Sequence, residues 1–115
     1  MATIKRLEDI RAWQDSRVLC SDVYLLLKDN KDRSFCDQMK RASVSVMNNI
    51  AEGFERQSNK EFRQFLYIAK GSAGEVRSMV ILGGDLGYFN EKQVELIHEK
   101  LLNLSAQIAG FIRVL

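Results

Sequence analysis

An apolar seam near the end of the chain constrains the fold more than any other feature. Its members recur in strict alternation of three and four, at Val94, Ile97, Leu101, Leu104, Ile108, Phe111 and Leu115. That spacing places all of them on one side of an α-helix. The 115 residues include no proline and only seven glycines, so little in the sequence interrupts long helices. The seam therefore predicts an all-α fold.

Three earlier segments have the same helical period. We expect helices over about residues 9–29, 35–56 and 59–86, followed by the helix of the seam over 91–114. Short connections join them, so successive helices should run antiparallel. The sequence predicts a single domain, residues 1–115, folded as an up-down-up-down four-helix bundle.

Capping residues mark where these helices begin. Ser34 is the expected N-cap of the second helix. Ser58 with Glu61, and Asn90 with Gln93, form capping boxes before the third and fourth helices. Each of the two middle helices should bury one apolar stripe. The stripes are Phe35, Met39, Ala42, Val46, Ile50 and Gly53, then Phe62, Leu66, Ala69, Ala73, Val76 and Val80, with Phe65 at the border.

The first helix has two apolar lines instead of one. The first line is Ile10, Trp13, Cys20, Tyr24 and Leu27, and the second is Leu19, Val23 and Leu26. One apolar face is enough for a small bundle. The second line therefore suggests burial against another chain.

Cysteine content, hydropathy and net charge limit the classes of protein that fit this sequence. The two cysteines, Cys20 and Cys36, are expected to be reduced core residues and not a disulfide. No run of 18 apolar residues occurs, and residues 1–9 lack an apolar signal region, so we expect a cytoplasmic protein without a membrane partner. The formal net charge of +2 is too small to indicate a nucleic-acid-binding protein by itself.

The parts needed for catalysis are missing from the sequence. Glu95 and His98 have the spacing of a di-iron ligand pair, but His98 is the only histidine and lies beside the seam. The glycines of the segment 71–74 follow no strand and lack a Walker ending, so we interpret them as close-packing residues inside a helix. No histidine is poised beside either cysteine. We expect no metal, no cofactor and no enzymatic activity.

One polar group accompanies the second helix. Arg41, Ser45, Asn49, Glu52 and Arg56 recur at spacings of four, four, three and four, so they share a face beside the core stripe. We expect Asn49 and Glu52 to bond to neighbouring helices or to a neighbouring subunit, in a structural or assembly role. The alternative is a ligand-facing polar groove.

A basic stripe follows on the third helix. Arg63, Lys70 and Arg77 are seven residues apart, Lys60 and Tyr67 lie close to the same side, and Arg56 precedes them at the turn. Residues 31–77 contain nine Lys and Arg against six Asp and Glu, so the positive excess gathers here. Such a stripe could track a phosphate backbone. Its alternative is a solvated helix face.

Several of these segments resemble a known family. They are Gln38–Ala42, Ser45, Asn49–Gly53, Arg56, Ser58, Glu61–Phe62, Phe65–Leu66, Ile68–Ala69, Gly71–Ser72 and Glu75, with Leu7, Ile10, Trp13 and Gln14 upstream and Leu86–Tyr88 downstream. The pattern is similar to the four-helix bundle proteins encoded by bacterial 23S ribosomal RNA intervening sequences, sometimes labelled S23 ribosomal proteins.

This resemblance implies a bundle that assembles as a homopentameric ring. A related protein is the accessory variability determinant of diversity-generating retroelements, which partners a reverse transcriptase and binds nucleic acid. Our leading hypothesis is a non-catalytic homo-oligomer that contacts RNA or another nucleic acid through the basic face of the third helix. The rival is a protein-interaction scaffold or accessory subunit, for example for a reverse transcriptase, without direct nucleic-acid binding.

Overall fold

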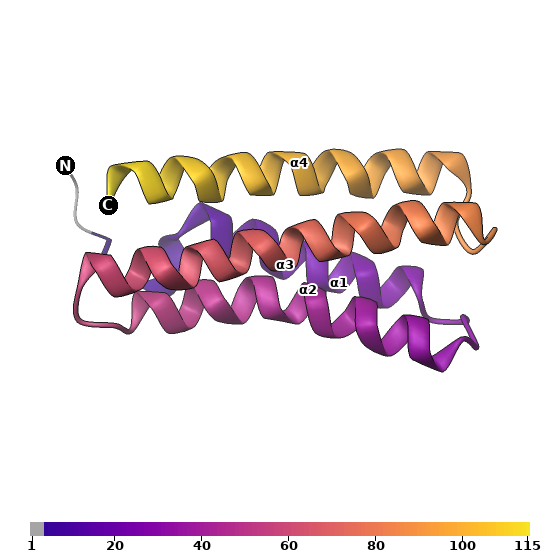
Figure 1. Ribbon diagram of the computed structural model, residues 1–115, viewed down its shortest axis with the longest axis horizontal. Coiled ribbons are helices and arrows are strands. Elements are labelled where there is room, and N and C mark those ends of the chain that lie inside the picture. Colours follow the sequence, from indigo (N-terminus) through magenta and orange to yellow (C-terminus); the bar gives the residue numbers. More distant parts are fainter. Residues whose placement is uncertain (1–3) are drawn as a thin grey trace.

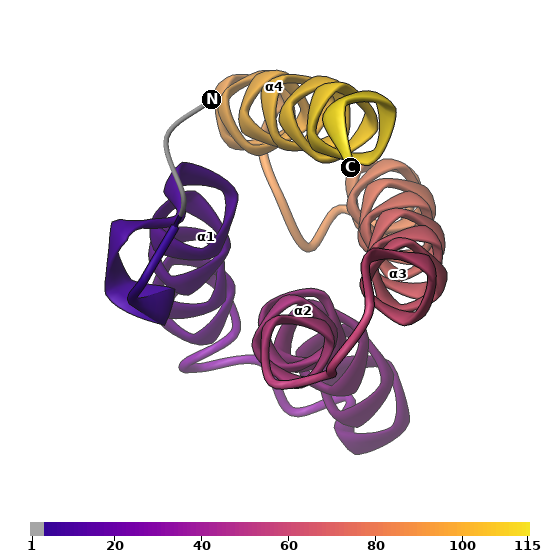
Figure 2. The same ribbon diagram turned by 90° about the vertical axis from the view of Figure 1, so that its left-hand side faces the viewer.

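The computed structural model describes residues 4–115 and contains four α-helices in an antiparallel bundle. They are α1 (Arg11–Leu26), α2 (Arg33–Phe54), α3 (Asn59–Asp85) and α4 (Glu91–Val114). Successive helices run in opposite directions along the long axis (Figure 1). All of them surround one core (Figure 2). The all-α, up-down-up-down prediction is confirmed, and residues 1–3 of the predicted domain lie outside the described part.

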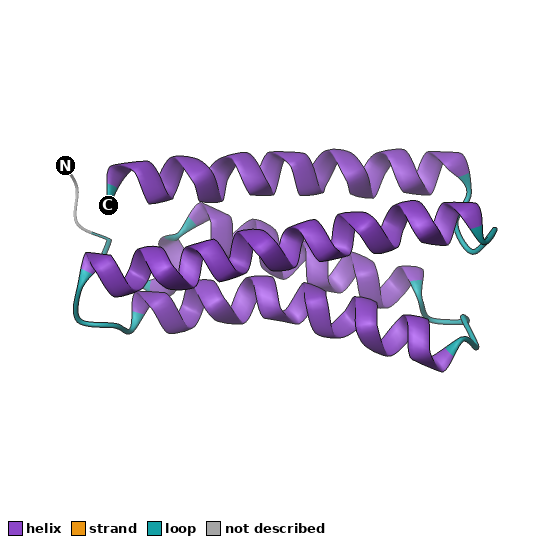
Figure 3. Cartoon of the chain, in the orientation of Figure 1, coloured by secondary structure: helices purple, strands orange, loops and turns teal. Residues whose placement is uncertain are grey.

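Helices and short connections account for the described chain (Figure 3). The predicted stripes of α2 and α3 are buried at every position, from Phe35 to Gly53 and from Phe62 to Val80. On α4 the seam buries Ile97, Leu101, Leu104 and Ile108, while its end positions are partly covered. Close packing of these stripes is the main source of stability. None of the described helices is long and apolar enough to cross a membrane.

Helix α1 packs differently from its prediction. Leu19 and Val23, expected against another chain, are fully buried in this one. Tyr24, expected in the core, is 47% exposed. The cause is the rotation of α1, which points Ala12, Ser16, Leu19 and Val23 inward. The second apolar line therefore belongs to the core of the chain itself.

Helix α1 is also shorter than the predicted span 9–29. A 3₁₀ turn, Leu7–Asp9, precedes it, and the extended backbone at Ile10 separates the two. The chain leaves the helix after Leu26 and turns before Asn30. These two breaks limit the first helix to Arg11–Leu26.

The cap of α2 is Asp32, so the prediction of Ser34 is wrong. The Asp32 carboxylate accepts from the backbone N–H of Phe35 at 3.1 Å. The helix ends at Phe54 and not at Arg56. Both halves of the Asn90–Gln93 box form. At α3 only one half of the predicted Ser58–Glu61 box forms. The Ser58 hydroxyl accepts from the Glu61 N–H at 3.2 Å, while the Glu61 carboxylate accepts from that hydroxyl at 3.5 Å and not from the Ser58 backbone.

Asp32 also joins the start of α2 to the connection between α3 and α4. The Tyr88 hydroxyl donates to its carboxylate at 2.6 Å, and the Tyr88 ring meets Phe35 edge-on. The hydrogen bond from Tyr88, and then that from Phe35 N–H, hold the pKa of Asp32 below its ordinary value of 3.8. The same bond raises the pKa of Tyr88 above its ordinary value of 10.0.

We expect Tyr88→Phe to lower the melting temperature at neutral pH, because the bond is lost while the ring remains. A carboxyl group whose pKa is lower in the folded than in the unfolded state stabilises the fold at pH values above its unfolded-state pKa. That stabilisation is lost as the pH falls through the folded-state pKa. The gap between wild type and variant should therefore narrow below pH 3.8. Thermal melts followed by circular dichroism across pH measure it. A gap that stays constant into acid would contradict the assignment.

Candidate nucleic-acid interface

The three heptad-spaced cations of α3 lie on the flank of that helix beside α4. We call Arg63, Lys70 and Arg77 the α3 cation row. The next position of the same heptad is Gly84, where an added Cβ would lie 3.0 Å from Val94 of α4. Lys70 and Arg77 are exposed and Arg63 is half-buried. Seven residues rise about 10.5 Å along a helix, so the row is a line of evenly spaced charges.

No member of the cation row is neutralised within residues 4–115. The ion pairs of the described chain involve Arg6, Arg11, Arg56 and Lys100. Glu61 in the first turn of α3 and Glu75 in its middle project from other sides of the helix. The row therefore presents uncompensated positive charge to solvent.

The outer surface of α3 next to the row has an exposed aromatic ring and two glycines. Tyr67 is 62% exposed, one helical turn from both Arg63 and Lys70, and Lys60 is exposed one turn earlier. An added Cβ at Gly71 or Gly74 would meet nothing within 4 Å. The interpretation of these two glycines as close-packing residues is therefore wrong, because they face solvent. They leave the backbone of α3 open on its outer surface, in the two turns that follow Tyr67.

Arg56 lies apart from the cation row. Its guanidinium pairs with Glu52 at 3.0 Å and covers the Phe65 ring at 4.7 Å from the centroid. Phe65 is on the flank of α3 that faces α2, because an added Cβ at Gly53 would lie 2.8 Å from Phe65 Cβ. The structure thus brings Lys60 and Tyr67 near the row and leaves Arg56 on the other flank.

The polar group of α2 is hydrogen-bonded to α3 through Ser45. The hydroxyls of Ser45 and Ser72 lie 2.8 Å apart and share a hydrogen bond. The Asn49 amide donates to the carbonyl and the hydroxyl of Ser45, at 2.8 and 3.0 Å. Glu52 accepts a hydrogen bond from Arg56, which lies just beyond the end of α2, and Arg41 is exposed. The group forms a polar link between α2 and α3 with Asn49 supporting Ser45.

We expect Asn49→Ala to lower the free energy of unfolding by about 1 kcal/mol. Two hydrogen bonds of about 1 kcal/mol each are lost, and the better helix propensity of Ala returns about 0.6 kcal/mol. RNA affinity should change little. Chemical denaturation, light-scattering mass and RNA binding measure the three effects. A variant with unchanged stability and unchanged mass would show that Asn49 has no structural or assembly role.

Sequence reasoning missed a second surface, along the edge where α1 meets α2. Arg17 lies over the Trp13 ring at 5.6 Å, and Lys40 of α2 lies over the Tyr24 ring at 5.0 Å. The spacing of four between Trp13 and Arg17 was a usable signal, since such residues are neighbours on a helix. The Tyr24–Lys40 pair depends on the rotation of α1 and had no such signal.

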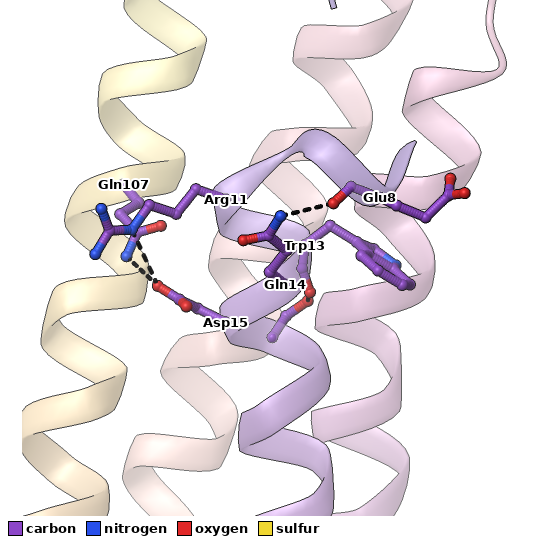
Figure 4. Close-up of polar contacts among 7 residues, drawn as sticks. Glu8, Arg11, Trp13, Gln14, Asp15 and Gln107 are labelled. Carbon is purple, nitrogen blue, oxygen red and sulfur yellow. Dashed lines mark hydrogen bonds and ion pairs between the residues drawn. The ribbon is translucent and has the colours of Figure 1, made fainter. Parts of the chain in front are cut away.

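The opposite side of α1 is bridged to α4 by polar contacts. Gln107 donates to the Asp15 carboxylate at 2.6 Å, and Arg11 approaches the same carboxylate at 3.8 Å. Arg11 and Asp15 project from one side of α1, toward Gln107 of α4, and Trp13 projects from the other side (Figure 4). Lys100 pairs with Asp22 further along. A groove of about 480 Å³ separates the two helices here.

The cysteines are buried and free, as predicted. Burial raises the pKa of both thiols. The Cys20 thiol donates to the Ser43 carbonyl at 3.0 Å. His98 is half-buried on α4, and no three His, Cys, Asp or Glu side chains gather as a metal site within the described residues. Neither thiol is activated as a nucleophile.

Comparisons with known proteins identify a family and a solved structure with the same fold. The family model described as "23S rRNA-intervening sequence protein" matches residues 8–110. A crystal structure from Bacteroides thetaiotaomicron VPI-5482, described as a protein with unknown function from the S23 ribosomal protein family, has the same fold, with a TM-score of 0.82 and 23% identity. The match covers 88% of this chain and 97% of that one. A comparison with curated proteins gives no match.

Proposed function

The chain belongs to the 23S rRNA-intervening sequence protein family, and we propose that it is a non-catalytic, self-assembling bundle that binds structured RNA or another nucleic acid through α3. The proposal rests on the α3 cation row, whose charges have no ion-pair partner in residues 4–115. Lys60 and Tyr67 extend the contact surface beside the row. Arg56 contributes only if it leaves Glu52.

The row fits a phosphate backbone better than a base edge. Its cations lie along one line on a rigid helix, which positions charge but supplies no hydrogen-bond pattern for reading sequence. The exposed backbone at Gly71 and Gly74 allows a nucleic-acid strand to approach closely. Tyr67 offers one ring for stacking. Binding should therefore be salt-dependent and only weakly sequence-specific.

Self-assembly is supported by apolar side chains that the single chain leaves exposed. Ile68, Leu82 and Leu86 are exposed on the α2 side of α3, and Val18, Leu25 and Leu96 are exposed near the α1–α4 groove. The α2–α3 side and the α1–α4 side of the bundle lie opposite each other (Figure 2). Contacts between unlike surfaces generate rings when the rotation closes. We propose a homopentamer, whose light-scattering mass would be about five times the 13.2 kDa of one chain.

The test of RNA binding is fluorescence anisotropy with a labelled, hairpin-rich RNA at low salt. The test variant replaces Arg63, Lys70 and Arg77 by Gln. The control replaces Lys31, Lys92 and Arg113 by Gln, an equal change of charge at exposed positions outside the row. We expect binding by wild type and control and weak binding by the test variant. No binding by wild type at low salt, or equal binding by all three proteins, would exclude the proposal.

The alternative is a protein-interaction scaffold or accessory subunit, for example for a reverse transcriptase. The same exposed apolar side chains support it, since such surfaces also dock protein partners. A protein partner retained after nuclease treatment, by the row variant as well as by wild type, would favour the scaffold.

A further inference from the structure

We propose that the α1–α2 edge is a second RNA contact, specific for single-stranded segments. This inference rests on the proposed RNA binding and adds a separate surface to it. We define the aromatic edge as Trp13, Arg17, Tyr24 and Lys40. Each of its two rings has a cation over it, at 5.6 Å for Arg17 on Trp13 and at 5.0 Å for Lys40 on Tyr24.

Three of the four members of the aromatic edge follow one line on α1, and Lys40 faces them from α2. Trp13, Arg17 and Tyr24 are separated by four and seven residues, which keeps them on one side of the helix. Lys28 follows four residues later, in the turn after the helix, and is exposed. The two rings are eleven residues apart, or about 16 Å along the helix axis. A strand contacting both must extend over several nucleotides, as it does in known single-strand sites of about 4–16 nucleotides.

The cations of the aromatic edge keep their charge available. No acidic residue lies three or four positions from Arg17 on its own helix, the distances at which helical ion pairs form. Asp37 lies three residues before Lys40 and is near enough in sequence to pair, but that ion pair does not form within the described residues. Both cations lie over the rings instead, which holds them in place without neutralising them.

This combination fits unpaired nucleotides. Bases that are not in a duplex stack on aromatic rings and on guanidinium planes. Tyr24 is 47% exposed, so part of its ring is open to a base, while the Lys40 ammonium beside it can meet the phosphate. A duplex keeps its bases stacked in its interior, so it can contact only the cations of the aromatic edge. The aromatic edge should therefore prefer single strands.

The aromatic edge is independent of the cation row. The edge between α1 and α2 and the edge between α3 and α4 lie on opposite sides of the bundle (Figure 2). Trp13 projects away from the polar bridge to α4 (Figure 4). Variants of one surface therefore leave the other intact.

Trp13 provides the readout, because it is the only tryptophan of the chain. We would titrate the full-length protein at low salt with a 12-nucleotide uridine oligomer and follow Trp13 fluorescence, with a blunt RNA duplex titrated in parallel. Wild type should be quenched by the oligomer. The double variant Arg17→Gln with Lys40→Gln, and separately Tyr24→Leu, should bind it about tenfold more weakly or worse. Lys92→Gln with Arg113→Gln serves as the charge-matched control.

The cation-row variant separates the two proposals. It should lose affinity for hairpin-rich RNA and keep the quenching of Trp13 by the oligomer. Hairpin-rich RNA bound by wild type without any Trp13 quenching by the oligomer would overturn the aromatic edge alone. Equal affinity of the edge variants and wild type would overturn it as well. A reduced light-scattering mass for Tyr24→Leu would assign the edge to subunit contact instead. Failure of wild type to bind either RNA would remove the proposed function itself.

Discussion

Gly83→Ala should destabilise the protein by about 2 kcal/mol, although alanine is the better helix former. Gly83 lies near the end of α3, and the Phe89 ring packs directly against its Cα. An added methyl would collide with that ring. Because the ring has little room to move, the overpacking should cost about 3 kcal/mol, the upper end of the usual range, and the gain in helix propensity returns about 1 kcal/mol. Phe89 is itself buried against Phe35, so it cannot turn away freely.

The same helix provides a matched control for this prediction. Gly74→Ala makes the identical chemical change at a position with open space around it. It should stabilise the protein by about 0.5–1 kcal/mol, through helix propensity alone. Urea denaturation measures both variants. In the background of Phe89→Ala, where the ring is absent, the penalty of Gly83→Ala should largely disappear. A destabilising effect that persists in that background would refute the collision as its cause.

Replacing the α3 cation row by glutamine should weaken binding to hairpin-rich RNA by about ten- to a hundredfold at low salt. Each exposed cation–phosphate contact is worth about 0.5–1 kcal/mol, and three such contacts add when they act independently. Single variants at Arg63, Lys70 and Arg77 should therefore each cost about a third of the binding free energy that the triple variant loses.

This additivity separates the row from a specific pocket. In a pocket one residue would dominate, whereas a row that follows a backbone shares the energy among its members. Anisotropy titrations of the three single variants and the triple variant supply the comparison. One variant alone accounting for the whole loss would contradict the row.

The fold was predictable where a helix has one apolar stripe. The stripes of α2, α3 and α4 have a single orientation that buries them, so periodicity alone identifies their core positions. Helix α1 offered two lines, and sequence could not decide which positions of each the bundle covers. Packing against α2 and α4 buries Leu19 and Val23 of one line and Cys20 of the other, and leaves Tyr24 half-exposed. The cap of α2 was ambiguous for a similar reason, because Tyr88, which holds Asp32, lies 56 residues away.

The candidate interface was predictable in part. Spacing by seven was enough to place the cation row on one flank of α3. It could not place Arg56, whose position depends on Glu52 and on the Phe65 ring. It also could not show that Gly71 and Gly74 face solvent, since glycine is compatible with both close packing and open surface. Contacts between helices, and not the pattern within one helix, decide these positions.

The most direct test of the RNA-binding account is the salt dependence of affinity for hairpin-rich RNA. The logarithm of the association constant should fall linearly with the logarithm of salt concentration for wild type. Loss of three phosphate contacts should reduce that slope by about two to three in the row variant, while the charge-matched control at Lys31, Lys92 and Arg113 keeps the slope of wild type. Equal slopes for wild type and the row variant would show that Arg63, Lys70 and Arg77 do not contact the phosphates.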